Sequence, residues 1–274
     1  KCLGSEMTGW FDWPRLGGFN LLKELKKWQN NFYTPYDCVL VVGIGGSYAG
    51  AKALAEIYGH KFSSELLMQG KELKTKPLYF AGHTLSESYL LELLEGLDGS
   101  LPLVTVISKS GNTLEPLLSF SIIRKYLEER FGVEKASERI LTVTEEESTG
   151  ALEALSQSQG YKQFFIPKDI GGRYSLFTAA SLLPLFLAGH NVSEVLEGAN
   201  SLFHSLSEES DHPVFKAAAI SSLLQIFPLA VFTIYAPFFI LLIKSLLKRF
   251  SVSGCSGQLI VTTSQTLTID STES

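Results

Sequence analysis

The sequence predicts an α/β fold in which helices cover both faces of a parallel sheet, giving a three-layer sandwich. Between about residues 37 and 165, short apolar runs rich in β-branched residues alternate with longer segments of helical periodicity, as expected of parallel strands joined by crossover helices. The apolar runs are nearly continuous, which is typical of strands that are buried on both faces. After residue 170 the pattern becomes mainly helical, so a second subdomain is expected to begin near His190.

Five strands are expected from these apolar runs, at residues 39–44, 78–81, 103–108, 140–144 and 164–166. Four helices are expected between them, at residues 47–58, 86–97, 112–130 and 148–159. Ser or Asn is available at the helix starts, where its side chain can accept a hydrogen bond from a free backbone amide. Each helix is long enough to cross the sheet.

Three more helices are expected later in the chain, at residues 175–188, 193–206 and 213–224. Residues 226–243 carry no charge and contain Pro228 and Pro237. Because proline interrupts a helix, we interpret this stretch as a buried strand at 231–235 followed by a helix at 237–250. A membrane-spanning segment, which needs about 20 apolar residues, is the alternative.

The composition describes a folded protein of two domains or one large domain. The chain has 274 residues, of which 45% are apolar and 19% charged, and this apolar content excludes intrinsic disorder. The net charge of −5, without a long basic run, argues against a nucleic-acid-binding protein, which needs a basic face. The three cysteines are widely spaced. They indicate neither a disulfide framework nor a zinc site, and a reducing cytoplasm fits best.

No metal site is expected, because the five histidines have no metal-ligand spacing. His83 follows the strand expected at 78–81, and we interpret it as a hydrogen-bonded structural residue, with a place at a pocket edge as the alternative. Glu145, Glu146 and Glu147 are consecutive and are expected to lie in a solvated loop.

A glycine-rich turn, Gly-Ile-Gly-Gly-Ser-Tyr at residues 43–48, follows the first expected strand and opens a helix. Glycine lets the backbone approach a ligand closely, and the free amides of a helix N-terminus point toward negative charge. The turn lacks the third glycine of the dinucleotide-binding fingerprint and the Lys-Ser/Thr pair of a P-loop. It indicates an anion site or, alternatively, only a tight strand-to-helix turn.

A second loop, Ser-Lys-Ser-Gly-Asn-Thr at residues 108–113, again lies between an apolar strand and a long helix. Its hydroxyl, amide and backbone donors are the groups that a phosphate monoester needs. Ligands of open α/β sheets bind at the carboxyl ends of the strands, so the two loops are expected to share one pocket. Helix capping by the same Ser and Asn side chains is the alternative.

A third motif, Asp-Ile-Gly-Gly-Arg-Tyr-Ser at residues 169–175, precedes an apolar helix. The Arg173 guanidinium could bind a substrate oxygen or stabilise a developing oxyanion. The alternative is a salt bridge at the surface, to Asp169 or another acid.

Taken together, five segments resemble the bacterial glucose-6-phosphate isomerases, a family built of two sugar isomerase (SIS) domains. They are GWFDWP at 9–14, GIGGSYAG at 43–50, FAGH at 80–83, SKSGNTLEP at 108–116 and GGRYSLFTAASLLPLFLAG at 171–189. Their order and approximate spacing are those of the family. The resemblance implies a first SIS domain at residues 9–190 and a partial second SIS domain, an incomplete α/β subdomain, at residues 191–274.

The resemblance also implies an activity and a setting. The family interconverts glucose 6-phosphate and fructose 6-phosphate through an enediolate, in glycolysis and gluconeogenesis. It works in the cytoplasm as a homodimer, without a metal or cofactor.

Site residues are implied only where this sequence matches the family. The residues that the resemblance places around the sugar phosphate are Ser108, Lys109, Ser110 and Thr113. Gly46 and Ser47 would line the same pocket. Arg173, with Gly172, would lie beside the reacting carbons and stabilise the enediolate.

One departure from the family concerns proton transfer. The family's catalytic base is a glutamate in a Gly-Glu-Ser-like motif, and the corresponding register here gives Ser251-Val252-Ser253. Proton abstraction from carbon needs a positioned base of suitable pKa. The family's ring-opening histidine and C-terminal lysine are also unmatched. A catalytically inactive sugar-phosphate-binding module is therefore the alternative function.

Overall fold

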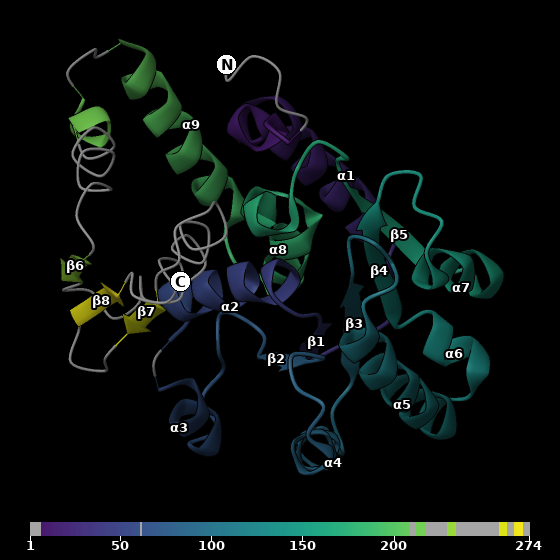
Figure 1. Cartoon of the computed structure of the whole chain (residues 1–274). Coiled ribbons are helices and arrows are strands. Elements are labelled where there is room, and N and C mark those ends of the chain that lie inside the picture. Colours follow the sequence, from purple (N-terminus) through teal and green to yellow (C-terminus); the bar gives the residue numbers. More distant parts are fainter. Residues whose placement is uncertain are drawn as a thin grey trace. The chain divides into compact units, whose positions relative to one another are not determined.

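The computed structural model describes residues 7–60, 62–208, 212–216, 229–233, 258–261 and 266–270. The chain divides into two compact units, Lys1–Leu196 and Glu197–Ser274. The first unit contains a five-stranded sheet and the second a three-stranded sheet (Figure 1).

All five strands of the first unit run parallel, in the order β2-β1-β3-β4-β5. Their bounds are Cys38–Val42 for β1, Leu78–Ala81 for β2, Pro102–Ile107 for β3, Ile140–Glu145 for β4 and Lys162–Ile166 for β5. Val41 of β1 pairs with Phe80 of β2 on one side and with Thr105 of β3 on the other. The five expected strands are confirmed, with small shifts at their ends.

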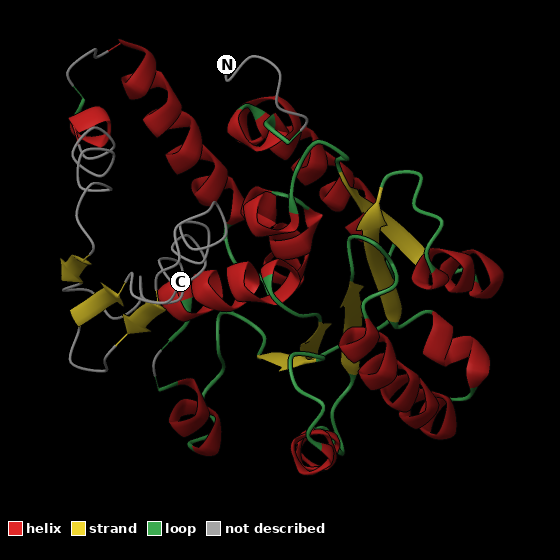
Figure 2. Ribbon diagram, viewed as in Figure 1, coloured by secondary structure: helices red, strands yellow, loops and turns green. Residues whose placement is uncertain are grey.

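Helices connect the strands and cover both faces of the sheet (Figure 2). The α-helices are α1 at Phe19–Gln29, α2 at Gly46–Tyr58, α3 at Ser63–Met68, α4 at Glu87–Gly96, α5 at Leu114–Phe131, α6 at Val133–Ser137, α7 at Ala151–Gln159, α8 at Ala179–Leu187 and α9 at Val192–Glu208. Short 3-10 helices lie at Gly9–Phe11 (η1) and Gly172–Phe177 (η3), and a π-helix lies at Pro14–Gly18 (η2).

Successive strand residues point to opposite faces of the sheet, and this alternation builds two cores. Val39 and Val41 of β1 belong to the core shared with α1, α2 and α8, whereas Leu40 and Val42 belong to the core shared with α4, α5 and α7. All four side chains are fully buried. Figure 1 shows the corresponding helices on the two sides of the sheet. The three-layer α/β sandwich confirms the predicted fold class.

The helix starts agree only in part with the expected caps. Ser86 caps α4, because its Oγ accepts a hydrogen bond from Tyr89 N at 3.3 Å. Ser47 instead lies inside α2, and the N-cap residues of α5 and α7 are Thr113 and Gly150.

The expected caps Asn112 and Ser148 lie in the preceding loops. Asn112 bonds to Ala151, and Ser148 bonds both to Ser110 and, locally, to Gly150 N at 3.2 Å. The helix expected from residue 175 begins as the 3-10 helix η3. Helix α8 then starts at Ala179, because Thr178 Oγ1 accepts a hydrogen bond from Ala180 N at 3.3 Å.

Among the described residues of the first unit, three α-helices were not expected. Helix α1 buries Leu21, Leu22 and Leu25, whose spacing is the signal of a helix packed on a core. Helices α3 and α6 have 6 and 5 residues, which is too short for a periodic pattern to show.

The three strands of the second unit pair antiparallel, in the order β6-β8-β7. Their bounds are Leu229–Thr233 for β6, Gln258–Val261 for β7 and Thr266–Asp270 for β8. Strand β6 overlaps the strand expected at 231–235, whereas β7 and β8 were not expected. The helix expected at 237–250 and most of the helix at 213–224 lie outside the described residues. Within the described part of the chain, no helix has both the length and the apolar character needed to cross a membrane.

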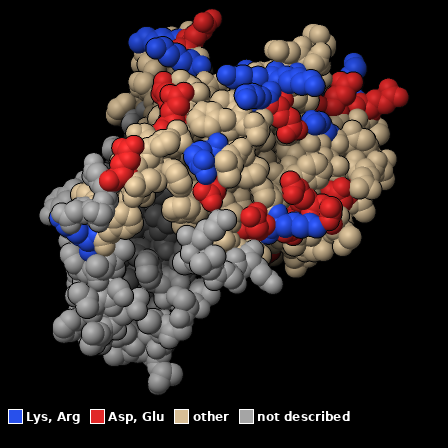
Figure 3. Space-filling view, turned by 90° about the horizontal axis from the view of Figure 1, so that it is seen from above, with Lys and Arg blue, Asp and Glu red and all other residues tan. Residues whose placement is uncertain are grey.

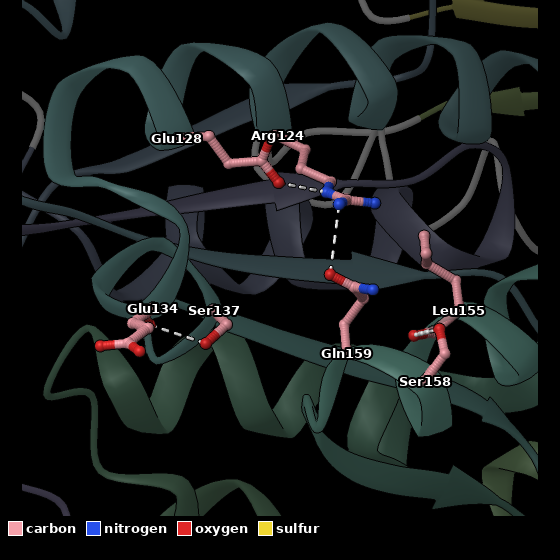
Figure 4. A network of polar contacts seen from close by, with 7 residues as sticks. All are labelled: Arg124, Glu128, Glu134, Ser137, Leu155, Ser158 and Gln159. Atoms are coloured by element: carbon pink, nitrogen blue, oxygen red, sulfur yellow. Dashed lines mark hydrogen bonds and ion pairs between the residues drawn. The ribbon is translucent and has the colours of Figure 1, made fainter.

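Polar contacts link α5 to α7 on one face of the sheet (Figure 4). Arg124 Nε donates to Glu128 Oε1 at 2.6 Å within α5, and Arg124 Nη2 donates to Gln159 Oε1 of α7 at 3.2 Å. The hydroxyls of Ser137 and Ser158 bond to carbonyls within their own helices. Arg124 therefore holds together two helices that follow adjacent strands.

The same substitution at two buried threonines should change stability in opposite directions. Thr105 is 0% exposed and Thr144 is 1% exposed. The Thr105 hydroxyl has no hydrogen-bond partner in the described structure. A buried, unpaired polar group costs about 1–3 kcal/mol, so Thr105→Val should raise the free energy of unfolding by about 1 kcal/mol.

Thr144→Val is the matched comparison. Thr144 Oγ1 donates to Glu153 Oε2 at 3.0 Å, so this substitution removes a donor from a buried carboxylate and should lower the free energy of unfolding by about 1–3 kcal/mol. Urea unfolding followed by circular dichroism measures both changes. A Thr105→Val variant less stable than the unsubstituted chain would show that its hydroxyl is paired.

Candidate functional site

The order of the strands creates a crevice at the centre of the sheet. Strand β2 lies on one side of β1, and β3, β4 and β5 follow on the other side. In a sheet of this order, ligands bind outside the carboxyl ends of the two strands where the chain changes direction, here β1 and β3. Residues 43–48 follow β1 and residues 108–113 follow β3. Both loops therefore lie at this edge.

The loop after β1 turns sharply into α2. Gly45 has a φ of +59°, which favours glycine, and it is the N-cap residue of α2. Its carbonyl accepts a hydrogen bond from Ala49 N at 2.9 Å. Gly45 has no side chain with which to cap α2, and the amides of Ser47 and Tyr48 bond to the backbone carbonyls of Ile44 and Gly45 at 3.2 and 3.3 Å. The first amides of α2 thus have no side-chain cap.

The loop after β3 brings two hydroxyls together. Ser108 is 2% exposed, and its Oγ donates to Thr113 Oγ1 at 3.1 Å. Thr113 is half-buried and is the N-cap residue of α5, but within the described residues its side chain makes no cap hydrogen bond. A hydroxyl that accepts one hydrogen bond keeps its own proton for another acceptor. Thr113 Oγ1 can therefore donate to a ligand.

The starts of α2 and α5 differ from those of α4 and α8. Ser86 and Thr178 cap α4 and α8 with their side chains. Among the described residues the N-cap residues of α2 and α5 make no such bond, and neither do those of α1, α6 and α7, so what distinguishes α2 and α5 is their position after the adjacent strands β1 and β3. A helix N-terminus carries about half a positive charge together with free amides, and it attracts anions. Two such starts beside one crevice suit a phosphate group.

Lys109 is held by groups of neighbouring loops. Its Nζ lies 3.1 Å from Glu145 Oε1 and donates to the carbonyl oxygen of Lys168 at 3.1 Å. Glu145 was expected in a solvated loop, but it is the last residue of β4 and forms this ion pair. The Lys109 charge is therefore largely offset by a carboxylate of this chain.

The third motif contacts the first loop directly. A Cβ at Gly46 would overlap the carbonyl oxygen of Gly172, so this approach requires glycine at position 46. Ser175 Oγ donates to that carbonyl at 2.7 Å. Arg173 is the next residue of η3 and is exposed. The structure thus brings Gly46 and Gly172 together and places Arg173 one residue from their contact.

His83 packs beside the first loop as an aromatic ring. It stacks on Tyr48, with 4.8 Å between centroids and an interplanar angle of 4°, and it meets Tyr89 edge-on at 5.1 Å. His83 Nδ1 is buried and has no hydrogen-bond partner in the described structure, so at this atom the expected hydrogen bond is absent. Burial, and then the nearby charge of Lys52, lower the pKa of His83.

Two residues expected as helix caps join separate loops instead. Asn112 Oδ1 accepts a hydrogen bond from Ala151 N at 2.9 Å, and Ser148 Oγ donates to Ser110 O at 3.4 Å. Asn and Ser were expected to bond to backbone groups through their side chains, and both do so here. The partners are 39 and 38 residues away in the chain, and no local pattern reports such a distance.

Among the described residues, the other titratable and metal-ligating side chains form no further cluster at this edge. No three His, Cys, Asp or Glu side chains among the described residues group as metal ligands would. Cys38 is buried, and burial, together with Asp37, raises the pKa of its thiol to about 12. Positions 251–253 lie outside the described residues. On the face shown in Figure 3, acidic and basic residues are interspersed.

Comparison with known proteins identifies relatives of the chain. The family model described as phosphoglucose isomerase matches residues 24–253. The glucose-6-phosphate isomerase of Caldanaerobacter subterraneus subsp. tengcongensis is 42% identical over 196 residues, which are 72% of this chain and 43% of that protein. The Bacillus cereus enzyme is 37% identical over 223 residues, 81% of this chain and 49% of that protein. The chain therefore spans about half the length of the curated relatives it matches.

Solved structures agree with the sequence comparison. A hypothetical protein from Thermus thermophilus matches with a TM-score of 0.74 and 27% identity, over 92% of this chain and 57% of that one. A glucose-6-phosphate isomerase from Chlamydia trachomatis matches with a TM-score of 0.53 and 25% identity, over 69% of this chain and 33% of that one. The family model covers most of the chain, and the fold agrees with it; this chain belongs to the phosphoglucose isomerase family.

Proposed function

We propose that this chain binds a sugar phosphate as part of an enzyme that interconverts glucose 6-phosphate and fructose 6-phosphate. Its relatives are named glucose-6-phosphate isomerases. The observation that carries the proposal is the pair of helix starts, α2 and α5, which within the described residues lack side-chain caps and follow the adjacent strands β1 and β3. A phosphate anion is the kind of group that such helix starts bind.

The phosphate contacts would come mainly from the loop after β3. The Thr113 hydroxyl and the first amides of α5 donate to the phosphate oxygens, and we assign Ser108 to the same site as the residue that orients Thr113 by donating to its Oγ1. The other residues that we assign to substrate binding are Gly46, Ser47, Lys109, Ser110 and Gly172. The partly buried Ser108–Thr113 hydrogen bond supports this assignment, because it leaves the Thr113 proton available to an acceptor.

In the proposed reaction, a base moves a proton between C1 and C2 of the open-chain sugar, and the intermediate enediolate carries a negatively charged oxygen. We assign stabilisation of that oxygen to Arg173, whose guanidinium is always charged. Its place beside the contact of Gly46 with Gly172 supports this role. The base is assigned to none of the residues that the structure describes.

We assign residues 9–190 to a first SIS domain and 191–274 to part of a second one. The division of the chain after Leu196 supports a boundary in this region. A cytoplasmic homodimer that works in glycolysis and gluconeogenesis without metal or cofactor is proposed on the family resemblance.

The 274-residue chain should bind 6-phosphogluconate, measured by titration calorimetry, and should convert fructose 6-phosphate to glucose 6-phosphate in a coupled assay. Turnover supports the isomerase. Binding without turnover would favour the inactive sugar-phosphate-binding module. Absence of both would contradict a phosphate site at this edge.

Thr113→Val should weaken 6-phosphogluconate binding by about 10- to 100-fold. The substitution keeps the shape of the side chain and removes one hydrogen bond to a charged group, worth about 1.5–3 kcal/mol. Thr113→Ser retains the hydroxyl and should bind nearly as tightly as the unsubstituted chain. Equal affinity of the Val and Ser variants, measured by calorimetry, would remove Thr113 from the site.

Arg173→Ala should lower kcat/KM by about 10²–10³-fold, the usual effect of losing an oxyanion donor, and should change the Kd for 6-phosphogluconate much less. An interaction that strengthens in the transition state affects turnover more than binding. The coupled assay and calorimetry on the same preparation give both values. Similar losses in the two would mean that Arg173 only binds the substrate.

A further inference from the structure

The loop after β3 is anchored by the connection between β4 and α7, residues 146–150 with their flanking residues. The carbonyls of three successive loop residues accept hydrogen bonds from it: Lys109 O from Glu145 N at 2.9 Å, Ser110 O from Ser148 Oγ at 3.4 Å and Gly111 O from Leu152 N at 3.0 Å. In a planar peptide unit the N–H points opposite to the C=O. Anchoring these carbonyls therefore fixes the direction of the N–H groups of residues 110–112.

Asn112 joins the same loop to the start of the neighbouring helix. Its Oδ1 accepts a hydrogen bond from Ala151 N at 2.9 Å, which satisfies the first free amide of α7. Its own backbone N–H donates to Ser110 Oγ at 3.3 Å. Asn112 directly precedes Thr113, so the contact with α7 holds the residue next to the N-cap of α5.

Gly150 lets the two backbones meet. Its φ of −72° and ψ of 165° are open to any residue, so this glycine is not required by its own conformation. A Cβ at position 150 would overlap Ser110 O and lie 2.7 Å from Gly111 Cα. Both obstacles are backbone atoms, which cannot rotate away as a flexible side chain can. A larger residue at 150 must therefore displace the loop.

The helices that follow the loop and the connection are linked as well. Arg124 of α5 donates to Gln159 at the end of α7 at 3.2 Å (Figure 4). Helices α5 and α7 are thus joined both near their starts, through Asn112, and farther along. This second link limits how far α7 can retreat from the loop.

We propose that Asn112 and Gly150 are positioning residues for the loop after β3, residues 108–113. They hold Ser110 and Thr113 in the conformation that presents their hydroxyl donors, with the Gly111 N–H bonded to Ser108 O at 3.0 Å, and they act through the β4–α7 connection rather than by touching the ligand. This inference rests on the proposed function, because the loop is taken to bind a phosphate.

The first test compares Gly150→Ala with Gly96→Ala in the full 274-residue chain. Gly96 ends α4, and a Cβ there meets nothing within 4 Å, so this variant controls for adding a methyl group. Calorimetry with inorganic phosphate and with 6-phosphogluconate measures binding, and hydrogen exchange with mass spectrometry measures protection of residues 108–113. Gly150→Ala should bind at least tenfold more weakly and exchange faster in this loop, and Gly96→Ala should do neither.

Asn112 provides a second test if Gly150→Ala fails to fold. Asn112→Ala removes the acceptor for Ala151 N, whereas Asn112→Asp keeps it. Protection of the amides at the start of α7 should therefore fall in the Ala variant and persist in the Asp variant. The binding assay leaves out Asn112→Asp, because the negative charge of Asp would weaken anion binding whether or not the loop is held in place.

The outcomes distinguish the positioning role of Asn112 and Gly150 from the proposed phosphate site. Unchanged loop protection in folded Gly150→Ala, or equal protection of the start of α7 in both Asn112 variants, would overturn the positioning role. If the unsubstituted chain binds neither probe, the proposed phosphate site is wrong. Hydrogen exchange would then still decide whether residues 112 and 150 hold the loop.

Discussion

The fold depends on one constraint, the placement of β3 directly beside β1. The chain leaves β1 into α2 on one face of the sheet and leaves β3 into α5 on the other, as the separate cores containing Leu54 and Phe120 show. Adjacent loops that depart to opposite faces open a crevice between them. Both helix starts therefore border the same space, and without this strand order neither the glycine-rich turn nor the serine-rich loop would have a partner.

Close contacts between backbones help to determine the shape of this edge. Gly46 meets the carbonyl of Gly172, and Gly150 meets the backbone of Ser110 and Gly111. In each pair a loop after one strand is supported by the loop after another. The hydrogen bonding between the loops after β3 and β4 then determines which donors the loop after β3 can offer.

The sequence predicts the sheet well, because buried parallel strands need continuous apolar runs and this requirement is local. It predicts the loops that follow β1 and β3 for the same reason. It does not predict side-chain partners that are set by contacts between residues far apart in the chain. Asn112 has the side chain of a helix cap but serves a different helix, and His83 stacks on Tyr48 from another strand end. Residue chemistry indicates anion binding by Arg173 and by the loop that contains Thr113, the resemblance implies the substrate, and the structure adds the geometric setting of both residues.

The helix starts of α2 and α5 have a consequence for the way in which ligand binding depends on pH. Peptide dipoles do not titrate, and the Lys109 ammonium is already matched by Glu145. A ligand held chiefly by such dipoles experiences a receptor whose electrostatics stay constant across neutral pH. The variable partner is then the ligand's own phosphate, whose second ionisation lies at about pH 6. Recognition at this edge would follow the charge state of the sugar phosphate instead of that of the protein.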